Sequence, residues 1–162
     1  MVRWNKSSIG SLAKASVAAG LLAAVVEMIF VLPIQYALGA SPTVVFQSIA
    51  SGALGKRAFE EGTSAALLGV GVHILISLVS AALYMAAAFR WEFLRRRAIV
   101  SGSLFGVLAY VVMNFLVIPL SAIGFRWPRS LPLFLVSLAI HMFAFGVPIA
   151  VVCARFLRDR KT

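Results

Sequence analysis

Acidic residues, cysteine and charge of either sign are scarce in this sequence. Only five of the 162 residues are Asp or Glu, and charged residues together make up 12% of the chain. A soluble globular domain normally carries about 25% charged residues, so the composition excludes an ordinary soluble domain. The single cysteine, Cys153, cannot form an internal disulfide, which excludes a small disulfide-stabilised scaffold.

Long apolar runs dominate instead. Hydrophobic residues make up 62% of the chain, and the mean hydropathy is +1.00. A helix needs about 20 mostly apolar residues to cross a bilayer, and the segments near 13–38, 63–89, 98–120 and 131–154 meet that need. Lipid satisfies no backbone hydrogen bonds, and these runs are too long for barrel strands. We therefore expect one all-α transmembrane domain over 1–162, an integral membrane four-helix bundle in the lipid bilayer.

The basic residues indicate an orientation. Short loops rich in Lys and Arg stay in the cytoplasm, so we expect a bacterial inner-membrane protein with both termini and the 90–97 loop inside. Placed at helix ends, these charges do not form the continuous soluble face that nucleic acid binding needs. The inner side carries Arg3, Lys6, Lys14, Arg90, Arg95, Arg96, Arg97, Arg155, Arg158, Arg160 and Lys161; the outer side has only Lys56, Arg57, Arg126 and Arg129.

The first and third spans resemble each other in sequence. GLLAAVVEMIFVLP, which begins at Gly20, aligns without gaps with GVLAYVVMNFLVIP, which begins at Gly106, and seven of fourteen positions are identical. The second and fourth spans each hold one histidine at similar depth, His73 and His141. This predicts a duplicated two-helix hairpin. The pair Gly102 and Gly106 forms a GxxxG motif, which permits close approach of a neighbouring helix.

The first half contains an insertion in its outer loop. It holds SPTVVFQSIASGALG, in which Ser41 suits a helix cap, Pro42 the first turn and Gly55 the helix end. The segment near 42–55 is too short to span, so we expect an amphipathic helix on the outer surface or a re-entrant half-helix. Its polar face would hold Gln47, Ser48 and Ser51, and its apolar face Val45, Phe46, Ile49, Ala50 and Ala53.

Four strongly polar side chains lie deep within the spans. Residue counts place Glu27, His73, Asn114 and His141 near the middle of the bilayer, where they could form one binding cluster. An Asp at this depth costs about 3 kcal/mol on the insertion scale, so Glu27 is expected to be protonated, paired or near water. Polar groups in membrane helices often only hydrogen-bond their neighbours, for about 0.6 kcal/mol, and that purely structural role stays open for all four. Glu27 is the strongest functional candidate.

Three functions are compatible with this cluster. In the first, Glu27 and the histidines are a protonatable site in a small transporter, channel or sensor, which with only four helices would act as a homo-oligomer. In the second, His73 and His141 ligate a b-type haem, with Gly69 and Gly146 making room for the macrocycle. In the third, the chain is an accessory subunit that binds a membrane-protein partner.

An enzyme is not expected. The sequence shows no nucleophile-and-base motif, and two His with one Glu suggest a metal site only if the spans bring them within ligand reach. We therefore assign no catalytic residue and no metal ligand, and the cofactor stays unknown. The three prolines of the spans, Pro33, Pro119 and Pro148, free backbone carbonyls and are expected to mark kinks beside cavities.

Several apolar motifs resemble those of a known group of membrane proteins. QSIASGALG, the GVGVH of the second span, GVLAYVVMNFLVIPL and the final HMFAFGVPIA look like the YagU-like group of small bacterial inner-membrane proteins. The general pattern covers most of residues 15–155. The resemblance implies residence in the inner membrane and transfers no catalytic residue.

Overall fold

The computed structural model describes residues 6–122, 124 and 130–159, which form helices joined by short turns. Four helical stretches are long and apolar enough to cross a membrane: Gly10–Ala37, Gly62–Arg90, Ala98–Leu120 and Leu131–Arg158. No strand occurs within that described part of the chain. The predicted all-α fold is confirmed, with span ends within a few residues of those expected, and the chain is a multi-pass membrane protein.

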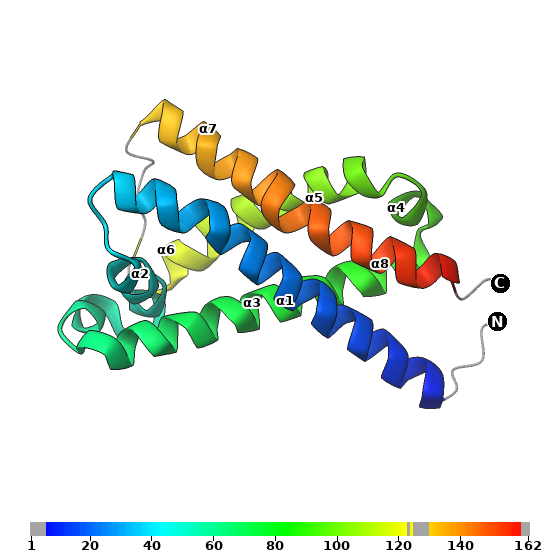
Figure 1. Ribbon diagram of the computed structural model, residues 1–162, viewed down its shortest axis with the longest axis horizontal. Helices are drawn as coiled ribbons and strands as arrows, with labels where there is room; N and C mark the ends of the chain where they lie inside the picture. The colour runs from blue at the N-terminus through cyan, green and yellow to red at the C-terminus, as the bar shows by residue number, and fades with distance from the viewer. Residues whose placement is uncertain (1–5, 123, 125–129, 160–162) are drawn as a thin grey trace.

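The spans run side by side along the long axis of the molecule (Figure 1). Their elements are α1 (Lys6–Ala37), α3 (Gly62–Arg90), then α5 (Ala98–Val112), the π-helical turn η2 (Met113–Val117) and α6 (Ile118–Leu120), and finally α7 (Leu131–Ile140), the π-helical segment η3 (His141–Gly146) and α8 (Val147–Asp159). The short helix α2 (Pro42–Leu54) with the 3-10 turn η1 (Gly55–Phe59) lies at one end, and α4 (Glu92–Arg96) at the other. We name these the α2 end and the α4 end.

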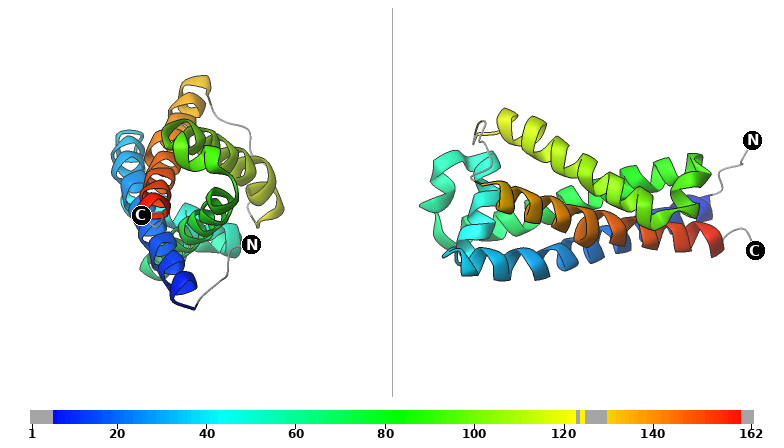
Figure 2. Two further views of the ribbon diagram at one scale, coloured as in Figure 1. Left: turned by 90° about the vertical axis from the view of Figure 1, so that its right-hand side faces the viewer. Right: turned by 90° about the horizontal axis from the view of Figure 1, so that it is seen from above.

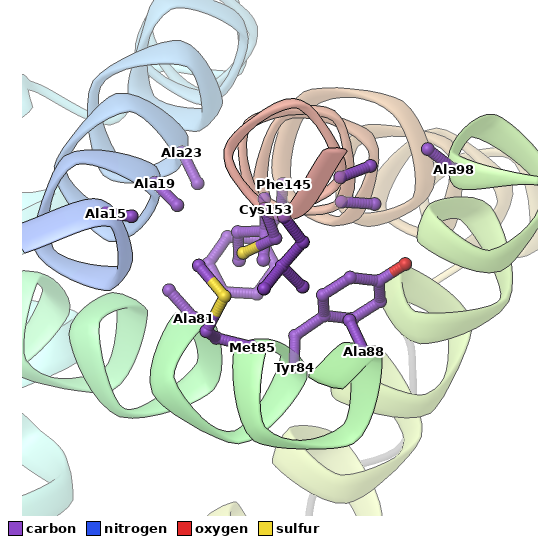
Figure 3. Packing of buried hydrophobic residues seen from close by; sticks show 14 residues of the cluster. Ala15, Ala19, Ala23, Ala81, Tyr84, Met85, Ala88, Ala98, Phe145 and Cys153 are labelled. Atoms are coloured by element: carbon purple, nitrogen blue, oxygen red, sulfur yellow. The ribbon is translucent and has the colours of Figure 1, made fainter. Parts of the chain in front are cut away.

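Small side chains form the core at the α4 end. Alanines of α1 and α3 meet the final helix there, and Tyr84, Met85 and Cys153 fill the space between them (Figure 3). Small residues let helix backbones approach closely, which is how membrane helices gain packing without a hydrophobic driving force. This core consists of Ala15, Ala19, Ala23, Ala81, Tyr84, Met85, Ala88, Ala98, Phe145, Ile149, Ala150, Cys153, Ala154 and Leu157.

Glycines bring the spans into contact. An added Cβ at Gly20 would lie 2.9 Å from the Ser77 carbonyl oxygen of α3, and one at Gly106 would overlap the carbonyl oxygen of His141. Gly102 meets Gly146 across the same interface. The GxxxG motif of the third span therefore packs against the fourth, as its small residues predict.

Two of the three span prolines follow a π-helical turn. Pro119 comes shortly after η2 and Pro148 shortly after η3, whereas Pro33 lies within the regular α-helix α1. A proline ring clashes with the carbonyl four residues earlier, and a wider turn relieves that clash. The last part of the third span, η2 and α6, diverges from α1 and α3 toward the α2 end (Figure 2).

Helix α2 lies across the end of the bundle (Figures 1 and 2). Its capping is as predicted: the Ser41 hydroxyl accepts from the Val44 amide at 3.4 Å, Pro42 occupies the first turn, and Gly55 is the C-cap. The predicted faces are correct in part. Val45 and Ala50 are buried and Ser48 is exposed, as expected, but Gln47 and Ser51, expected on the polar face, are buried, and Ala53 is exposed.

The reason is a contact that no local pattern shows. Gly69 of α3 has no side chain, and a Cβ there would overlap the carbonyl group of Phe46, so α2 crosses α3 in backbone contact. That approach turns Gln47 toward the start of α3, where its amide donates to the Gly62 carbonyl at 3.0 Å. Gln47 therefore attaches α2 to α3, whereas the Ser51 hydroxyl donates within α2, to the Ser48 carbonyl at 2.7 Å.

Candidate functional site

Three of the four polar residues predicted to converge do so. Glu27 of α1 is 5% exposed and lies between two imidazoles. Its Oε1 is 3.4 Å from Nε2 of His141, and its Oε2 is 3.9 Å from Nε2 of His73. The three side chains come from α1, α3 and η3, so the site is assembled from three spans and from both halves of the chain.

The hydrogen bond of His141 defines where one proton resides. Its Nδ1 lies 2.9 Å from the carbonyl oxygen of Ser137, one turn earlier. A carbonyl oxygen only accepts, so Nδ1 carries a hydrogen, and the Nε2 that faces Glu27 is the nitrogen that gains or loses the second proton of the ring. A carboxyl and an imidazole nitrogen 3.4 Å apart can hold one exchangeable proton, either on the carboxyl or on the ring.

His73 is held by backbone groups of α1. Its Nε2 lies 3.2 Å from the carbonyl oxygen of Ala24, so Nε2 donates to that oxygen. The Ser77 hydroxyl in turn donates to the His73 carbonyl at 2.9 Å. Gly20 allows this arrangement, because its close contact with α3 at Ser77 brings the backbone of α1 within reach of the imidazole.

A cavity of about 800 Å³ adjoins the site. It extends from Glu27 toward the α2 end, where Ser48, Ile49 and Ser51 of α2 line it. Its other walls come from α1, α3, the third span and α7, and they are mainly apolar and aromatic. Ligand sites in proteins occupy about 300–1,000 Å³ and combine apolar walls with a few placed polar groups, so both the size and the lining suit a bound molecule.

Asn114 lines the same cavity but does not join the cluster. Its amide nitrogen donates to the Tyr110 carbonyl at 2.9 Å, one turn earlier in the same span. That bond satisfies a backbone acceptor next to the π-helical turn η2, where Asn114 lies. The site predicted from four residues therefore has three at its centre, with Asn114 on its wall.

Tyr110 is a site residue that the sequence predictions did not assign. Its ring packs edge-on against the His141 imidazole, with centroids 5.1 Å apart, and against Phe134 at 5.5 Å. Edge-to-face pairs of this kind fix ring orientation as well as adding stability. Its place four residues before Asn114, on the same helix face, is the signal that could have indicated it.

The haem hypothesis receives no support from this geometry. Both Nε2 atoms face Glu27, and that of His73 also donates to a carbonyl, whereas an axial ligand must present its lone pair to the iron. Gly69 and Gly146, predicted to make room for the macrocycle, instead pack against α2 and α5. Among the residues that the structure describes, no group of three or more His, Cys, Asp or Glu has the arrangement of a metal site.

Fold and site together define an α-helical membrane protein with a buried carboxylate and two imidazoles beside an internal cavity. A family model described as a family of unknown function, DUF6789, matches residues 11–162, and the chain belongs to that family. Among curated proteins and among solved structures, no match to the chain was found. The resemblance to the YagU-like group stays a prediction.

Proposed function

We propose that the chain is a small proton-linked membrane transporter whose coupling site is Glu27 with His73 and His141. The observation that carries this proposal is the placement of Glu27, nearly fully buried between two imidazoles at the inner limit of a cavity. Ionisable groups within membrane spans are costly, and they commonly mark proton relays and substrate pathways. A purely structural cluster would not need the cavity.

The shape of the bundle favours a transporter over a channel. The cavity reaches Glu27 from the α2 end, whereas the alanine core closes the path toward the α4 end. Access to a mid-membrane site from one side at a time is the working principle of transporters. Four spans are few for the rocking of one half against the other, so we propose that the working unit is a homo-oligomer.

The charge distribution supports an inner-membrane orientation with the α4 end in the cytoplasm. Lys14, Arg90, Arg95, Arg96, Arg97, Arg155 and Arg158 lie toward that end. At the α2 end, Arg57 is paired with Glu61 at 3.3 Å, which reduces the local positive charge. By the positive-inside rule the cavity then faces the outer side. Arg3, Arg126, Arg129, Arg160 and Lys161 and the aromatic residues Trp4 and Trp127 lie outside the described residues, as does the side chain of Lys6.

Duplication of a hairpin remains part of the proposal. In each half a glycine at the aligned position, Gly20 or Gly106, brings the first helix into backbone contact with the second. Each second helix contributes its histidine to the same carboxylate. The acid itself occurs in one half only, because Met113 stands at the position aligned with Glu27.

Proton flux into proteoliposomes tests the function. Vesicles with an internal pH dye and an imposed potassium diffusion potential are compared for the native chain, Glu27→Gln and Glu92→Gln. Glutamine keeps the shape of a protonated carboxyl but has no proton that it can release and take up near neutral pH, so Glu27→Gln is expected to abolish flux. Glu92→Gln removes an exposed acid at the α4 end and is expected to leave flux intact. Flux that survives in Glu27→Gln, or that is missing from the native chain, contradicts the proposal.

A further inference from the structure

The walls of the cavity restrict what it can bind. Among the described residues that line it, Glu27 is the only acid, and none is Lys or Arg. When Glu27 is ionised and His73 and His141 are neutral, the cavity carries one negative charge and no positive charge. Electrostatic complementarity then favours a ligand of positive charge over an anion.

The size and polarity of the cavity argue against a metal or alkali cation. Hard cations such as calcium take six to eight oxygen ligands, whereas a single carboxylate faces this space. The cavity volume of about 800 Å³ is also within the range of pockets that hold drug-sized molecules. A bulky organic cation, by contrast, needs one anionic partner and a large apolar surface.

Aromatic and sulfur-containing side chains provide that surface. Rings attract cations through their electron-rich faces, and methionine adapts to irregular ligands. These groups come from η1, the third span, α7 and η3 as well as α1, so they surround the space in front of Glu27. The residues concerned are Met28, Phe59, Tyr110, Met113, Phe115, Phe134 and Phe145.

We propose that the cavity binds a lipophilic organic cation, an aromatic or alkyl ammonium or phosphonium, which displaces the proton shared by Glu27 and His141. This inference rests on the proposed function and names its substrate class. Binding leaves Glu27 ionised beside the cation and the His141 ring neutral, and one proton leaves to solvent for each cation bound. The titratable groups that face Glu27 are His73 of α3 and His141 of η3, with Tyr110 of α5 on the same wall; α2 and α7 contribute none among the described lining residues.

Two ions of equal size and opposite charge test the proposal. Tetraphenylphosphonium and tetraphenylborate binding to the purified chain in mild detergent is measured by isothermal titration, with a pH dye to count protons in weakly buffered solution. We expect saturable binding of the phosphonium with about one proton released per cation, and no saturable binding of the borate. Equal binding of both ions would mean simple partition into apolar surface and would overturn the inference, as would no phosphonium binding.

Variants at two acids locate the binding site. Glu27→Gln is expected to weaken phosphonium binding by at least about tenfold, a loss of about 1.4 kcal/mol, and to remove the proton release. Glu92→Gln, a matched change outside the cavity, is expected to bind like the native chain. Unchanged binding by Glu27→Gln overturns the inference. If that variant does not fold, native-chain affinity measured against pH decides, because proton competition requires phosphonium binding to weaken as pH falls and an unchanged affinity contradicts it.

The two proposals can fail separately. Glu27-dependent proton flux without phosphonium binding would leave the transporter standing and refute the substrate class. Phosphonium binding with proton release, in vesicles that show no flux in either ion gradient, would establish the cation site and refute transport. In that case the chain would be a cation sensor.

Discussion

The two ends of the bundle pack the same four spans in different ways. At the α4 end, helices meet through alanine and glycine and enclose a solid core, whereas at the α2 end they surround a cavity of about 800 Å³. Glu27 lies between the packed core and the cavity. Small residues draw helices together, and the π-helical turns η2 and η3 begin where the packing opens. A packed core and a cavity thus occur within one small bundle.

Breaking the glycine contacts is expected to have the largest effect. An alanine at Gly106 would place its Cβ on the carbonyl of His141, and backbone cannot move aside cheaply. We expect Gly106→Ala to cost about 3 kcal/mol, at the upper end for overpacking, or to prevent folding. Gly71→Ala, with nothing within 4 Å of the added carbon, is the control and should be neutral or slightly stabilising. Thermal unfolding in mild detergent compares them, and equal losses would contradict the packing described.

Removing a large side chain is expected to have the next largest effect, and the loss of stability should differ between the two ends. Ile149 is fully buried in the alanine core, so Ile149→Ala is expected to cost at least about 2 kcal/mol. Ile76 lines the existing cavity, and Ile76→Ala removes fewer packed contacts, with an expected cost below about 1 kcal/mol. The same unfolding measurement applies. A larger loss for Ile76→Ala would mean that the cavity is filled in the native state.

The buried polar group of the packed end should contribute less. The Tyr84 hydroxyl lies 2.7 Å from the Ser101 hydroxyl and donates to the Leu94 carbonyl at 3.2 Å, which joins α3 to α4 and α5. Tyr84→Phe is expected to cost about 1 kcal/mol, the usual value of such a hydrogen bond. In the variant the single Ser101 hydroxyl hydrogen still has an acceptor, the Leu94 carbonyl at 3.0 Å or the Arg97 carbonyl at 2.9 Å. A loss above about 3 kcal/mol would therefore show a role that these contacts do not explain.

Thiol accessibility sharpens the comparison without changing stability much. Cys153 is fully buried in the alanine core, so a charged methanethiosulfonate reagent should modify the native chain only slowly. Ser80→Cys, made in a Cys153→Ala background, places a thiol on the cavity wall and is expected to react at least about tenfold faster, because reactivity follows access. Similar rates, read by mass spectrometry, would contradict the difference between the two ends.

Much of the fold follows from the sequence because its signals are local. Four apolar runs of bilayer length give the spans, and the cap formed by Ser41, Pro42 and Gly55 gives α2. Depth along a span is a residue count, so the common level of Glu27, His73 and His141 could be predicted as well. The side of a helix that faces a neighbour is not a count, and there the predictions failed for Gln47, Ser51 and the two glycines assigned to haem.

The aligned prolines show the same limit. Pro33 and Pro119 stand at equivalent positions of the two similar spans, and yet only the second follows a π-helical turn. The local sequences differ as well, because five of the seven aligned positions from Glu27 and Met113 to these prolines are not identical. The surroundings also differ: α1 packs along α3 and the fourth span, whereas η2 and α6 diverge from both. How a freed carbonyl is accommodated therefore does not follow from the position of the proline alone.

The amino-acid sequence by itself determined that this chain is a membrane protein and how often it crosses the bilayer. It also determined the depth of the few polar side chains. Both follow because hydrophobic length and residue count are properties of each helix alone. Only the tertiary structure decided that Glu27 stands between two imidazoles and beside a cavity. Which faces of four helices meet depends on where backbones can approach, and that is settled by glycine and alanine contacts between segments far apart in the chain.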